Sequence, residues 1–534
     1  MRSTFMGLET AKRGMYTQQG ALHTTGHNIA NANTPGFTRQ RVNFEQTEPY
    51  PSPSINRPQI PGQMGTGVEA GSIQRVREKF LDIQYRGENN KLGYWETKME
   101  AMKKMEEVMN EPSDSGLSKT MDMFWQSLQD LAVNPTNSGA RSVVRQRGVA
   151  VAETFNYVAS SLSSIRTDLK NEINVTENQV NSLTRQIDNL NKRIGDVEPH
   201  GYLPNDLYDE RDRLIDELSK IVDVQVTYKS SGGGALDIAD GQATVKLMNE
   251  NGQASAVLVG AGGANAIKVE ADGPNGIISK IKVGTMEVSP EKFTSQGKLQ
   301  GLIEMYGYQD SSQGGVKGVY TDMLSELDNL AFTFAKEFNE IHADGMGLNE
   351  IEAGENVKNV FFTDPAQGTD GKPLPNDADP LTNHLGPREG FASRIGISQV
   401  IKDDLDNIAS ASGERPDEAA AGDSSVVLEL ADLINKSLEY KEGSSEEANF
   451  RNYYEGVIGN MAVISQESVR LTSNSDVLRQ AVDERRMSVS GVSLDEEMTN
   501  MIKFQHAYNA SARMITLQDE MLDKIVNGMG TGGR

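Results

Sequence analysis

The stretch SLDEEMTNMIKFQHAYNASARMITLQDEMLDKIVNGM, residues 493–529, decides the architecture that we expect for this chain. Its apolar residues recur at alternating steps of four and three, which is the spacing of a heptad seam along one helix face. Ser493 followed by Glu496 predicts the start of the helix, and Gly528 predicts its end. The predicted seam comprises Leu494, Met498, Met501, Gln505, Tyr508, Ala512, Ile515, Asp519, Leu522 and Val526. We expect the polar members Gln505 and Asp519 to set the register of helix pairing, because buried polar seam positions have that effect in coiled coils.

A second and thinner apolar stripe lies near the N-terminus, where residues 3–33 have helical periodicity. Its apolar members recur every seven residues, as in a heptad repeat. An ordinary amphipathic helix on a core would give a similar pattern. Because each stripe is thin and the two are complementary, we expect the two terminal helices to pair with each other or with copies in other subunits. The candidate interface residues are Leu8, Met15, Leu22, Ile29, Leu494, Met498, Met501, Tyr508, Ile515 and Leu522.

Composition excludes several classes of function. The 534 residues carry a net charge of −24, which argues against nucleic acid as the main partner. The mean hydropathy is −0.51 and no apolar run is long enough to span a bilayer, so we expect no membrane insertion. The N-terminus lacks the apolar core of an ordinary secretory signal peptide. The absence of cysteine excludes disulfides and thiol chemistry, and we expect no cofactor and no bound metal.

The middle of the chain alternates between helical and strand periodicity. Residues 138–197 predict one helix of about 90 Å, a length typical of fibrous or bundle architectures. From residue 222 the apolar period changes to two, and Asp240-Gly241 and Asn251-Gly252 predict hairpin turns. Further helices are predicted at 91–110, 117–133, 205–221, 299–306, 317–343, 426–440 and 446–485.

These patterns predict a multi-domain α+β fold. Its parts are a terminal coiled coil formed by the N- and C-terminal helices, a bundle domain built on the long helix, and an inserted small β domain. The predicted parts are 1–40 with 490–534 as the coiled-coil assembly domain, 41–90 as an extended connector, 91–221 with 426–489 as the α-helical domain, 222–298 as the β domain, 299–344 as helices returning to the α domain, and 345–425 as a loop-rich inserted module.

The segment ANANTPGFTRQR at 30–41 ends the first helix, because Pro35 disfavours helix at the preceding residue and Gly36 permits a positive φ. This segment resembles the N-terminal signature of the flagellar rod, hook and hook-associated protein family, and residues 493–529 resemble its C-terminal signature. Blocks at 65–86, 205–222 and 297–307 resemble the hook-associated protein 1 family, the first hook–filament junction proteins. The signature residues are Asn28, Asn31, Thr34, Pro35, Gly36 and Phe37.

The resemblance implies a structural protein rather than an enzyme. It implies export by the flagellar type III apparatus, secretion to the extracellular flagellum, and assembly as a ring at the hook–filament junction that adapts hook to filament. The implied partners are other copies of the chain, the hook protein, the next junction protein (hook-associated protein 3) and a cytoplasmic export chaperone.

Alternatives remain open at this point. The terminal signatures also fit a hook or distal rod protein, and residues 345–425 could hold a secreted cell-wall hydrolase. His23 and His27 have the spacing of helical zinc ligands, but polar helix surface is the favoured interpretation because a third ligand is missing from the pattern. Asp209, Glu210, Arg211 and Asp212 predict an ion-paired, mostly outward helix surface rather than a carboxylate site.

Overall fold

The computed structural model describes residues 5–528 apart from 56–57, 59–60, 112, 114–115, 250, 273–275, 311–314, 368–383, 414–418 and 442–446. The chain forms two compact units. Unit 1 comprises Met1–Leu92, Gln179–Ile267 and Asn474–Arg534, and unit 2 comprises Gly93–Asn178 and Lys268–Ser473. Parts of the predicted terminal domain (1–4 and 529–534) and of the predicted inserted module (368–383 and 414–418) lie outside the described residues.

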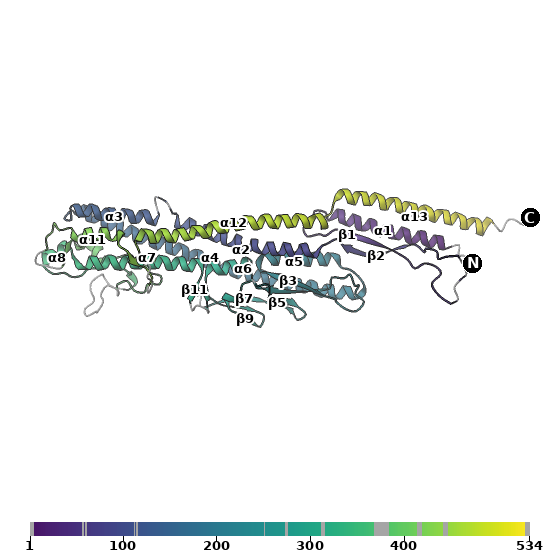
Figure 1. Cartoon of the computed structure of the whole chain (residues 1–534), viewed down its shortest axis with the longest axis horizontal. Helices are drawn as coiled ribbons and strands as arrows, with labels where there is room; N and C mark the ends of the chain where they lie inside the picture. The colour runs from purple at the N-terminus through teal and green to yellow at the C-terminus, as the bar shows by residue number, and fades with distance from the viewer. Residues whose placement is uncertain are drawn as a thin grey trace, which may run out of the picture. The chain divides into compact units, whose positions relative to one another are not determined.

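The terminal helices of unit 1 pair with each other, as the two heptad stripes predict. Helix α1 (Met6–Ala30) lies alongside helix α13 (Leu494–Gly528), which appear purple and yellow in Figure 1. Strands β1 (Gln40–Gln46) and β2 (Val68–Arg75) form an antiparallel pair that packs against α1. The predicted terminal coiled coil is therefore confirmed, and it rests on a β-hairpin that the sequence patterns did not predict.

The rest of unit 1 surrounds helix α5 (Asn205–Ile221), whose bounds match the prediction. It contains the first part of α2 (Lys79–Met109) and the last parts of α4 (Ser138–Val197) and α12 (Phe450–Ser490). An antiparallel sheet in the order β3-β4-β5-β6 follows α5. Its strands are β3 (Val224–Lys229), β4 (Gln242–Met248), β5 (Ala254–Gly260) and β6 (Gly263–Ala264).

The predicted connector and the helix after it need correction. The connector was predicted to extend to residue 90 and the helix to begin at 91, but α2 begins at Lys79. Its first turns lack an apolar stripe because their buried positions are polar, namely Asp82, Arg86, Asn89 and Asn90. Arg86 donates to Asp216 and Asn89 to Ser219, both on α5. Apolar periodicity therefore could not find this part of the helix.

Unit 2 holds the other parts of the long helices together with α3 (Leu117–Val133), α6 (Lys298–Tyr306) and α7 (Val319–Asp344). Its larger sheet has the order β11-β10-β8-β7, with β9 paired to β8. These strands are β7 (Ile267–Ala271), β8 (Ile278–Val283), β9 (Met286–Val288), β10 (Tyr308–Asp310) and β11 (Gly315–Lys317). The described part of the region predicted to be loop-rich, together with the residues just after it, contains short elements. They are β12 (Gly345–Met346), α8 (Leu348–Ala353), β13 (Phe362–Thr363), β14 (Gly396–Ile397), α10 (Gln399–Asp403), β15 (Ala411–Ser412), α11 (Ser425–Asp432), β16 (Leu438–Glu439) and β17 (Glu447–Ala448).

The core of unit 2 is a cluster of phenylalanine rings. Phe124 of α3 and Phe334 and Phe338 of α7 contact Phe361 and Phe362, with ring centroids 4.9–6.2 Å apart. Because Phe361 and Phe362 belong to the loop-rich region, that region contributes to the core rather than standing apart from it. Among the described residues, no helix combines the length and the apolar character needed to cross a membrane.

Candidate assembly interface at the terminal helix pair

The register between α1 and α13 is fixed at three places. A Cβ placed on Gly7 would lie 3.0 Å from the Gln518 side chain, and one on Gly14 would lie 3.2 Å from Ser511 Oγ. Farther along α1, Asn28 donates to Glu497 Oε2 at 3.2 Å. Seven residues forward along α1 match seven residues backward along α13, so the helices are antiparallel and in constant heptad register. The α1 residues on this line are Gly7, Gly14, Ala21 and Asn28, which are small enough for a close approach.

The β-hairpin covers one side of this helix pair. The hydroxyls of Thr10 and Thr17 donate to the carbonyls of Thr66 (3.4 Å) and Val68 (3.1 Å), next to or within β2. On α13, the ring of Phe504 meets Phe44 of β1 edge-on, with the centroids 5.9 Å apart. The hairpin side of the pair is therefore occupied within the chain.

The side away from the hairpin carries the predicted interface residues. Leu8, Met15, Leu22 and Ile29 lie about 160° around α1 from the Thr10–Thr17 line, and all four are half-buried. On α13, the residues that face α1 are Glu497, Phe504, Ser511 and Gln518. Four positions after each of them stands a half-buried residue of the predicted interface: Met501, Tyr508, Ile515 and Leu522. A step of four residues rotates a position part of the way around the helix axis. Because both helices are right-handed and run antiparallel, this rotation places the four α13 residues on the same side of the pair as the four α1 residues. We call these eight residues, with Leu494 and Met498 at the α13 end, the groove.

The structure differs from the predicted seam at several positions. Leu494 and Met498 are 48% and 50% exposed, and Gln505 and Asp519 are exposed as well. The register-setting role expected of Gln505 and Asp519 within this pair is therefore wrong. The residues that face α1 are Glu497, Phe504, Ser511 and Gln518 instead, which the apolar pattern passed over because three of them are polar.

The signature segment forms a turn between α1 and β1. Asn31 donates its side-chain amide to the His27 carbonyl at 3.1 Å, and Thr34 donates its hydroxyl to Asn31 Oδ1 at 3.1 Å. Gly36, which follows Pro35, has φ +82°, as predicted from its position after the proline. The Phe37 ring meets the His27 ring edge-on at 5.4 Å. The turn thus depends on signature residues bonding to one another and to the end of α1.

The same turn is anchored to α5 and to the α12–α13 connection. The Thr38 amide donates to Asp209 Oδ2 at 2.9 Å, and Arg213 packs over Gly36. Arg39 donates to Glu497 Oε1 and to Glu496 Oε2, both at 2.7 Å. Its amide also donates to the Ser490 carbonyl at the end of α12. The signature turn therefore connects the start of α13 to the interior of unit 1.

His23 and His27 show no sign of the zinc site considered from their spacing. His23 is exposed, whereas His27 lies 3.4 Å from Asp206 Oδ1 and 3.3 Å from the Asn31 amide. Across the described part of the chain, three or more potential metal ligands of the His or carboxylate type nowhere gather into one group.

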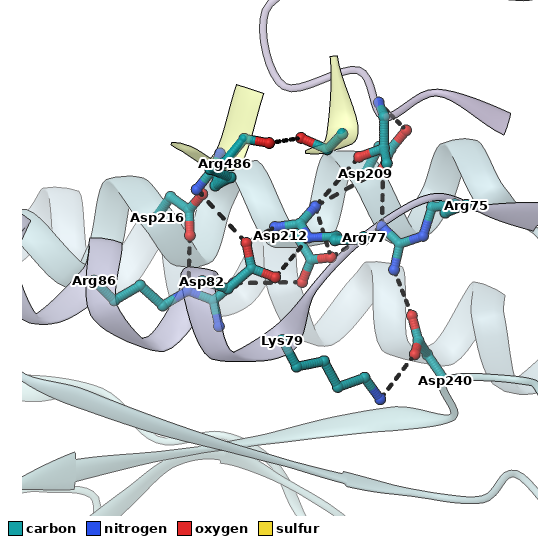
Figure 2. Close-up of polar contacts among 12 residues, drawn as sticks. Arg75, Arg77, Lys79, Asp82, Arg86, Asp209, Asp212, Asp216, Asp240 and Arg486 are labelled. Carbon is teal, nitrogen blue, oxygen red and sulfur yellow. Dashed lines mark hydrogen bonds and ion pairs between the residues drawn. The ribbon is translucent and has the colours of Figure 1, made fainter. Parts of the chain in front are cut away.

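A buried arginine–aspartate network lies behind the signature turn (Figure 2). Arg75, at the end of β2, donates to Asp209 at 2.8 Å and to Asp212 at 3.0 Å, and also pairs with Asp240. Arg77 pairs with Asp212 at 3.2 Å and makes a two-pronged contact with Asp82 at 2.7 and 2.9 Å. Asp212 is 2% exposed, and with Arg75, Arg77 and Asp240 it lines a cavity of about 410 Å³.

A second centre of the network connects α2, α5 and α12. Asp216 accepts from Arg86 Nε and from Arg486 Nη1, both at 2.7 Å. Arg486 also lies over the Tyr85 ring, with its guanidinium carbon 4.5 Å from the centroid. The two centres together join β2, α2, α5 and the end of α12, and these are the elements that carry α1 and α13.

The network is predominantly ionic. Burial opposes ionisation of Asp212, but the surrounding guanidinium groups of Arg77, Arg75, Arg211 and Arg86 outweigh burial and hold the pKa of Asp212 well below its usual range. Burial similarly opposes the charge on Arg75, yet its aspartate partners raise its pKa. Burial raises the pKa of Asp209 despite its pairing with Arg75, so it is Asp212 that the guanidinium groups hold ionised, and these paired charges support a structural role for the network.

The charged residues of α5 were predicted to face mostly outward, and this prediction is wrong for three of them. Asp209, Arg211 and Asp212 are 6%, 0% and 2% exposed, whereas Glu210 pairs with Arg213 near the surface. The sequence patterns also did not predict a role for Arg39, Arg75, Arg77, Arg86 and Arg486. The available signal was the clustering of five acidic residues in 205–216 and of three arginines in 75–86, but nothing in the sequence alone paired the two segments.

Comparison with known proteins gives three family matches. Residues 102–361 match the helical domain of the flagellar hook-associated protein FlgK, residues 8–38 match the flagella basal body rod protein family, and residues 484–528 match the C-terminal family of the basal body rod FlgEFG proteins. The chain is 45% identical to flagellar hook-associated protein 1 of Bacillus subtilis over the full length of both chains.

This chain belongs to the flagellar hook-associated protein 1 family. Flagellar hook-associated protein 1 of Salmonella typhimurium is 25% identical over 97% of this chain and 98% of its own. The solved hook junction protein FlgK of Burkholderia pseudomallei shares the fold, with a TM-score of 0.56 at 14% identity over 77% of this chain and all of that one. As a hook-associated protein, the chain is a structural component of the flagellum. The two rod-family matches coincide with α1 plus the signature turn and with α13 plus the end of α12.

Proposed function

We propose that this chain polymerises as a ring at the hook–filament junction of the flagellum and adapts hook to filament. The observation that carries the proposal is the groove, a set of half-buried apolar residues on the side of the terminal helix pair away from the β-hairpin, with Leu494 and Met498 48% and 50% exposed at one end. Apolar side chains left partly exposed along one side of a helix pair are typical of a protein interaction site. In this proposal Leu8, Met15, Leu22, Ile29, Leu494, Met498, Met501, Tyr508, Ile515 and Leu522 become buried between subunits.

The proposed partners are other copies of the chain, the hook protein and hook-associated protein 3. The matches of both terminal segments to rod families support contact with hook components, because such segments are shared among proteins of the same axial structure. Before assembly the chain would be held by a cytoplasmic export chaperone, pass through the type III apparatus and reach the extracellular flagellum. The absence of cysteine is compatible with this route, since no disulfide has to form or break in transit.

We further propose that the chain works without catalysis. The buried carboxylates of the arginine–aspartate network are already ion-paired, which supports a structural use of the most highly charged site in unit 1. The predicted division into a coiled-coil assembly domain (1–40 and 490–534) and outer α and β domains stays part of the proposal.

Deletion of residues 493–534 tests the proposal. We expect the shortened protein to remain folded and soluble, because the phenylalanine core and the arginine–aspartate network lie outside the deleted segment. We expect it to fail to assemble at the junction when produced in cells that lack the native protein, and motility is the readout. Junctions built from the shortened protein would contradict the proposal.

A hook or distal rod role is the second candidate, because the terminal families match rod proteins. The full-length identity to hook-associated protein 1 favours the junction role, since the rod-type matches cover only the two ends of the chain. Expressing this chain in strains that each lack the hook protein, a rod protein or hook-associated protein 1 separates the candidates. We expect rescue only in the last strain.

A further inference from the structure

Strand β4 of unit 1 has a turn at each end in which a glycine follows an aspartate or an asparagine. Asp240-Gly241 precedes the strand and Asn251-Gly252 follows it. In such a pair the backbone nitrogen of the glycine can attack the side-chain carbonyl carbon of the residue before it, because glycine has no side chain to hinder the approach. The contacts of the two turns differ, and they decide where this attack is possible.

The Asp240-Gly241 turn is held at both reacting groups. The Asp240 carboxylate pairs with Arg75 and lies 3.2 Å from Lys79 Nζ. The Gly241 amide donates to Glu198 Oε1 at 2.9 Å in a buried bond. Because charge-assisted bonds of this kind are about twice as strong as neutral ones, neither the carbon nor the nitrogen is free to move toward the other.

The Asn251-Gly252 turn is open at the surface. The Asn251 side chain is exposed, and within the part of the chain that the structure describes no hydrogen bond holds it. Gly252 has φ +70°, and a Cβ placed on it would meet nothing within 4 Å. The side-chain carbonyl carbon of Asn251 can therefore rotate toward the Gly252 nitrogen without breaking a contact of its own.

Hydrogen bonds to Asn249 keep this turn closed. The Gly252 amide donates to the Asn249 carbonyl at 2.9 Å, and the Gln253 amide donates to Asn249 Oδ1 at 2.8 Å. The Gly252 nitrogen must give up its hydrogen bond and its proton before it can attack, so the reaction proceeds from the opened turn. Exposed hydrogen bonds at a loop tip open at a low cost in free energy.

We propose that Asn251 is a deamidation site and that its conversion loosens the β4–β5 hairpin. The Gly252 nitrogen loses its proton to hydroxide and bonds to Cγ of Asn251, and the Nδ2 group takes up a proton and leaves as ammonia. Water then adds to one of the two carbonyl carbons of the resulting succinimide ring and gives aspartate or isoaspartate. The reaction consumes water and releases ammonia within a single chain, so it does not depend on assembly.

The isoaspartate product changes the backbone as well as the charge. Its main chain runs through the side-chain carbon of residue 251 and is longer by one methylene group. The Gly252 amide then no longer meets the Asn249 carbonyl in the observed geometry, and the paired ends of β4 and β5, where Met248 lies opposite Ala254, lose their closing turn. Both products also add a negative charge to a chain whose net charge is already −24.

Peptide mapping by mass spectrometry tests the site. The full-length protein is incubated at 37 °C in mildly alkaline buffer, with and without guanidinium chloride, and conversion of Asn251 and isomerisation of Asp240 are followed over several weeks. We expect Asn251 in the folded chain to react within about tenfold of its rate in the denaturant, whereas Asp240 should be slowed more than about a hundredfold. Protection of Asn251 as strong as that of Asp240 would overturn the proposal.

Asn249→Ala tests the opening step. The substitution removes the hydrogen bond from Gln253 to Oδ1 without touching the reacting pair, so Asn251 should convert about twofold to tenfold faster. The matched control is Asn265→Ala, which removes a side-chain bond of the same length, 2.8 Å, to the Val257 carbonyl of β5. We expect the control to leave the rate unchanged. Equal rates in the two variants would show that the turn does not control the reaction.

Hydrogen exchange of aged protein tests the structural consequence. We expect faster exchange in peptides from 242–260 of aged wild type, and no change there in aged Asn251→Gln, whose longer side chain does not form the five-membered ring. Freshly purified Asn251→Asp carries the new charge on an ordinary backbone and should exchange like fresh wild type. Unaltered exchange in aged wild type that has been converted to isoaspartate would contradict the loosening of the hairpin.

Discussion

The interior of the molecule and its terminal helix pair use apolar residues in opposite ways. Phe338, at the centre of the unit 2 core, is 0% exposed and is surrounded by other rings, whereas Met498 and Met514 on α13 are about half exposed. The core is complete within one chain. The terminal pair holds its register by small and polar contacts and leaves several apolar side chains of α13 about half exposed. A change in the interior should therefore cost stability, and a change at the terminal pair should cost assembly.

Asp212→Ala removes a central carboxylate of the buried arginine–aspartate network. The substitution leaves the buried guanidinium groups of Arg75 and Arg77 partly unpaired, so we expect a loss of about 3–5 kcal/mol from the stability of unit 1. Hydrogen exchange of peptides from α5 should accelerate accordingly. The neighbouring Glu210→Ala, which removes a pair with Arg213 nearer to the surface, should cost about 0–1 kcal/mol. Equal effects of the two substitutions would show that the buried network adds nothing beyond a surface pair.

His342 makes the interior of unit 2 sensitive to acid. The ring is 1% exposed and lies between the Asn359 carbonyl, 2.8 Å from Nδ1, and the Ala409 amide, which donates to Nε2 at 3.0 Å. Burial, together with the charge on nearby Arg141, lowers the pKa of His342 from 6.5 to about 4. The neutral ring is therefore the form that the folded state prefers.

This depressed pKa fixes the direction of the pH effect. Unfolded His342 binds a proton near pH 6.5 and the folded residue only near pH 4, so its stabilising contribution is present above pH 6.5 and is lost as the pH falls through that window. The loss should reach about 3 kcal/mol. Urea unfolding at pH 7.5 and 4.5 measures it through tryptophan fluorescence, because both tryptophans, Trp95 and Trp125, belong to unit 2. His342→Gln, which does not titrate, should lose correspondingly less stability between the two pH values.

The same contrast explains what the sequence could predict. The heptad pattern identified both terminal helices and the long helix α4 with its observed bounds, because apolar periodicity follows the surface that has to be covered. It gave Met501, Tyr508, Ile515 and Leu522 as seam residues of α13. It did not identify Glu497, Ser511 and Gln518, which contact α1. Those residues are polar, and their partners on α1 are Asn28 and two glycines. An apolar pattern therefore identifies the groove residues rather than the residues in contact with α1.

The ionic interior was beyond prediction for a different reason. Asp212 lies more than a hundred residues from Arg75 in the sequence, and a charged helix has the same local pattern whether its partners are water or guanidinium groups. The early start of α2 was missed on the same ground, since the buried residues Asp82 and Arg86 look like surface residues until α5 is placed beside them. Local patterns locate apolar faces, whereas buried ion pairs become visible only with the tertiary fold.

Gly14→Leu tests the terminal pair where its helices approach each other. A Cβ at Gly14 would already lie 3.2 Å from Ser511 Oγ, so the larger side chain must push α1 away from α13, at a cost of about 1–3 kcal/mol. Hydrogen exchange should rise in 6–30 and 494–528 and stay unchanged in unit 2. Gly20→Leu is the matched control, because a Cβ at Gly20 meets nothing within 4 Å. An identical response to both substitutions would show that the close approach at Gly14 does not hold the pair together.

Gly20→Ala is the smallest change and acts in the opposite direction. Gly20 lies inside α1 in open space, and replacing a mid-helix glycine with alanine reduces the entropy lost on folding, so we expect a gain of about 0.5–1 kcal/mol. Slower hydrogen exchange in 6–30 measures the gain in the isolated protein, where assembly plays no part. Motility of cells that carry the variant then tests the contrast between the interior, where changes cost stability, and the terminal pair, where changes cost assembly. Because Gly20 does not belong to the groove, motility should be retained in cells carrying this variant. A more stable helix that no longer assembles would place Gly20 against a neighbouring subunit and extend the interface beyond the groove.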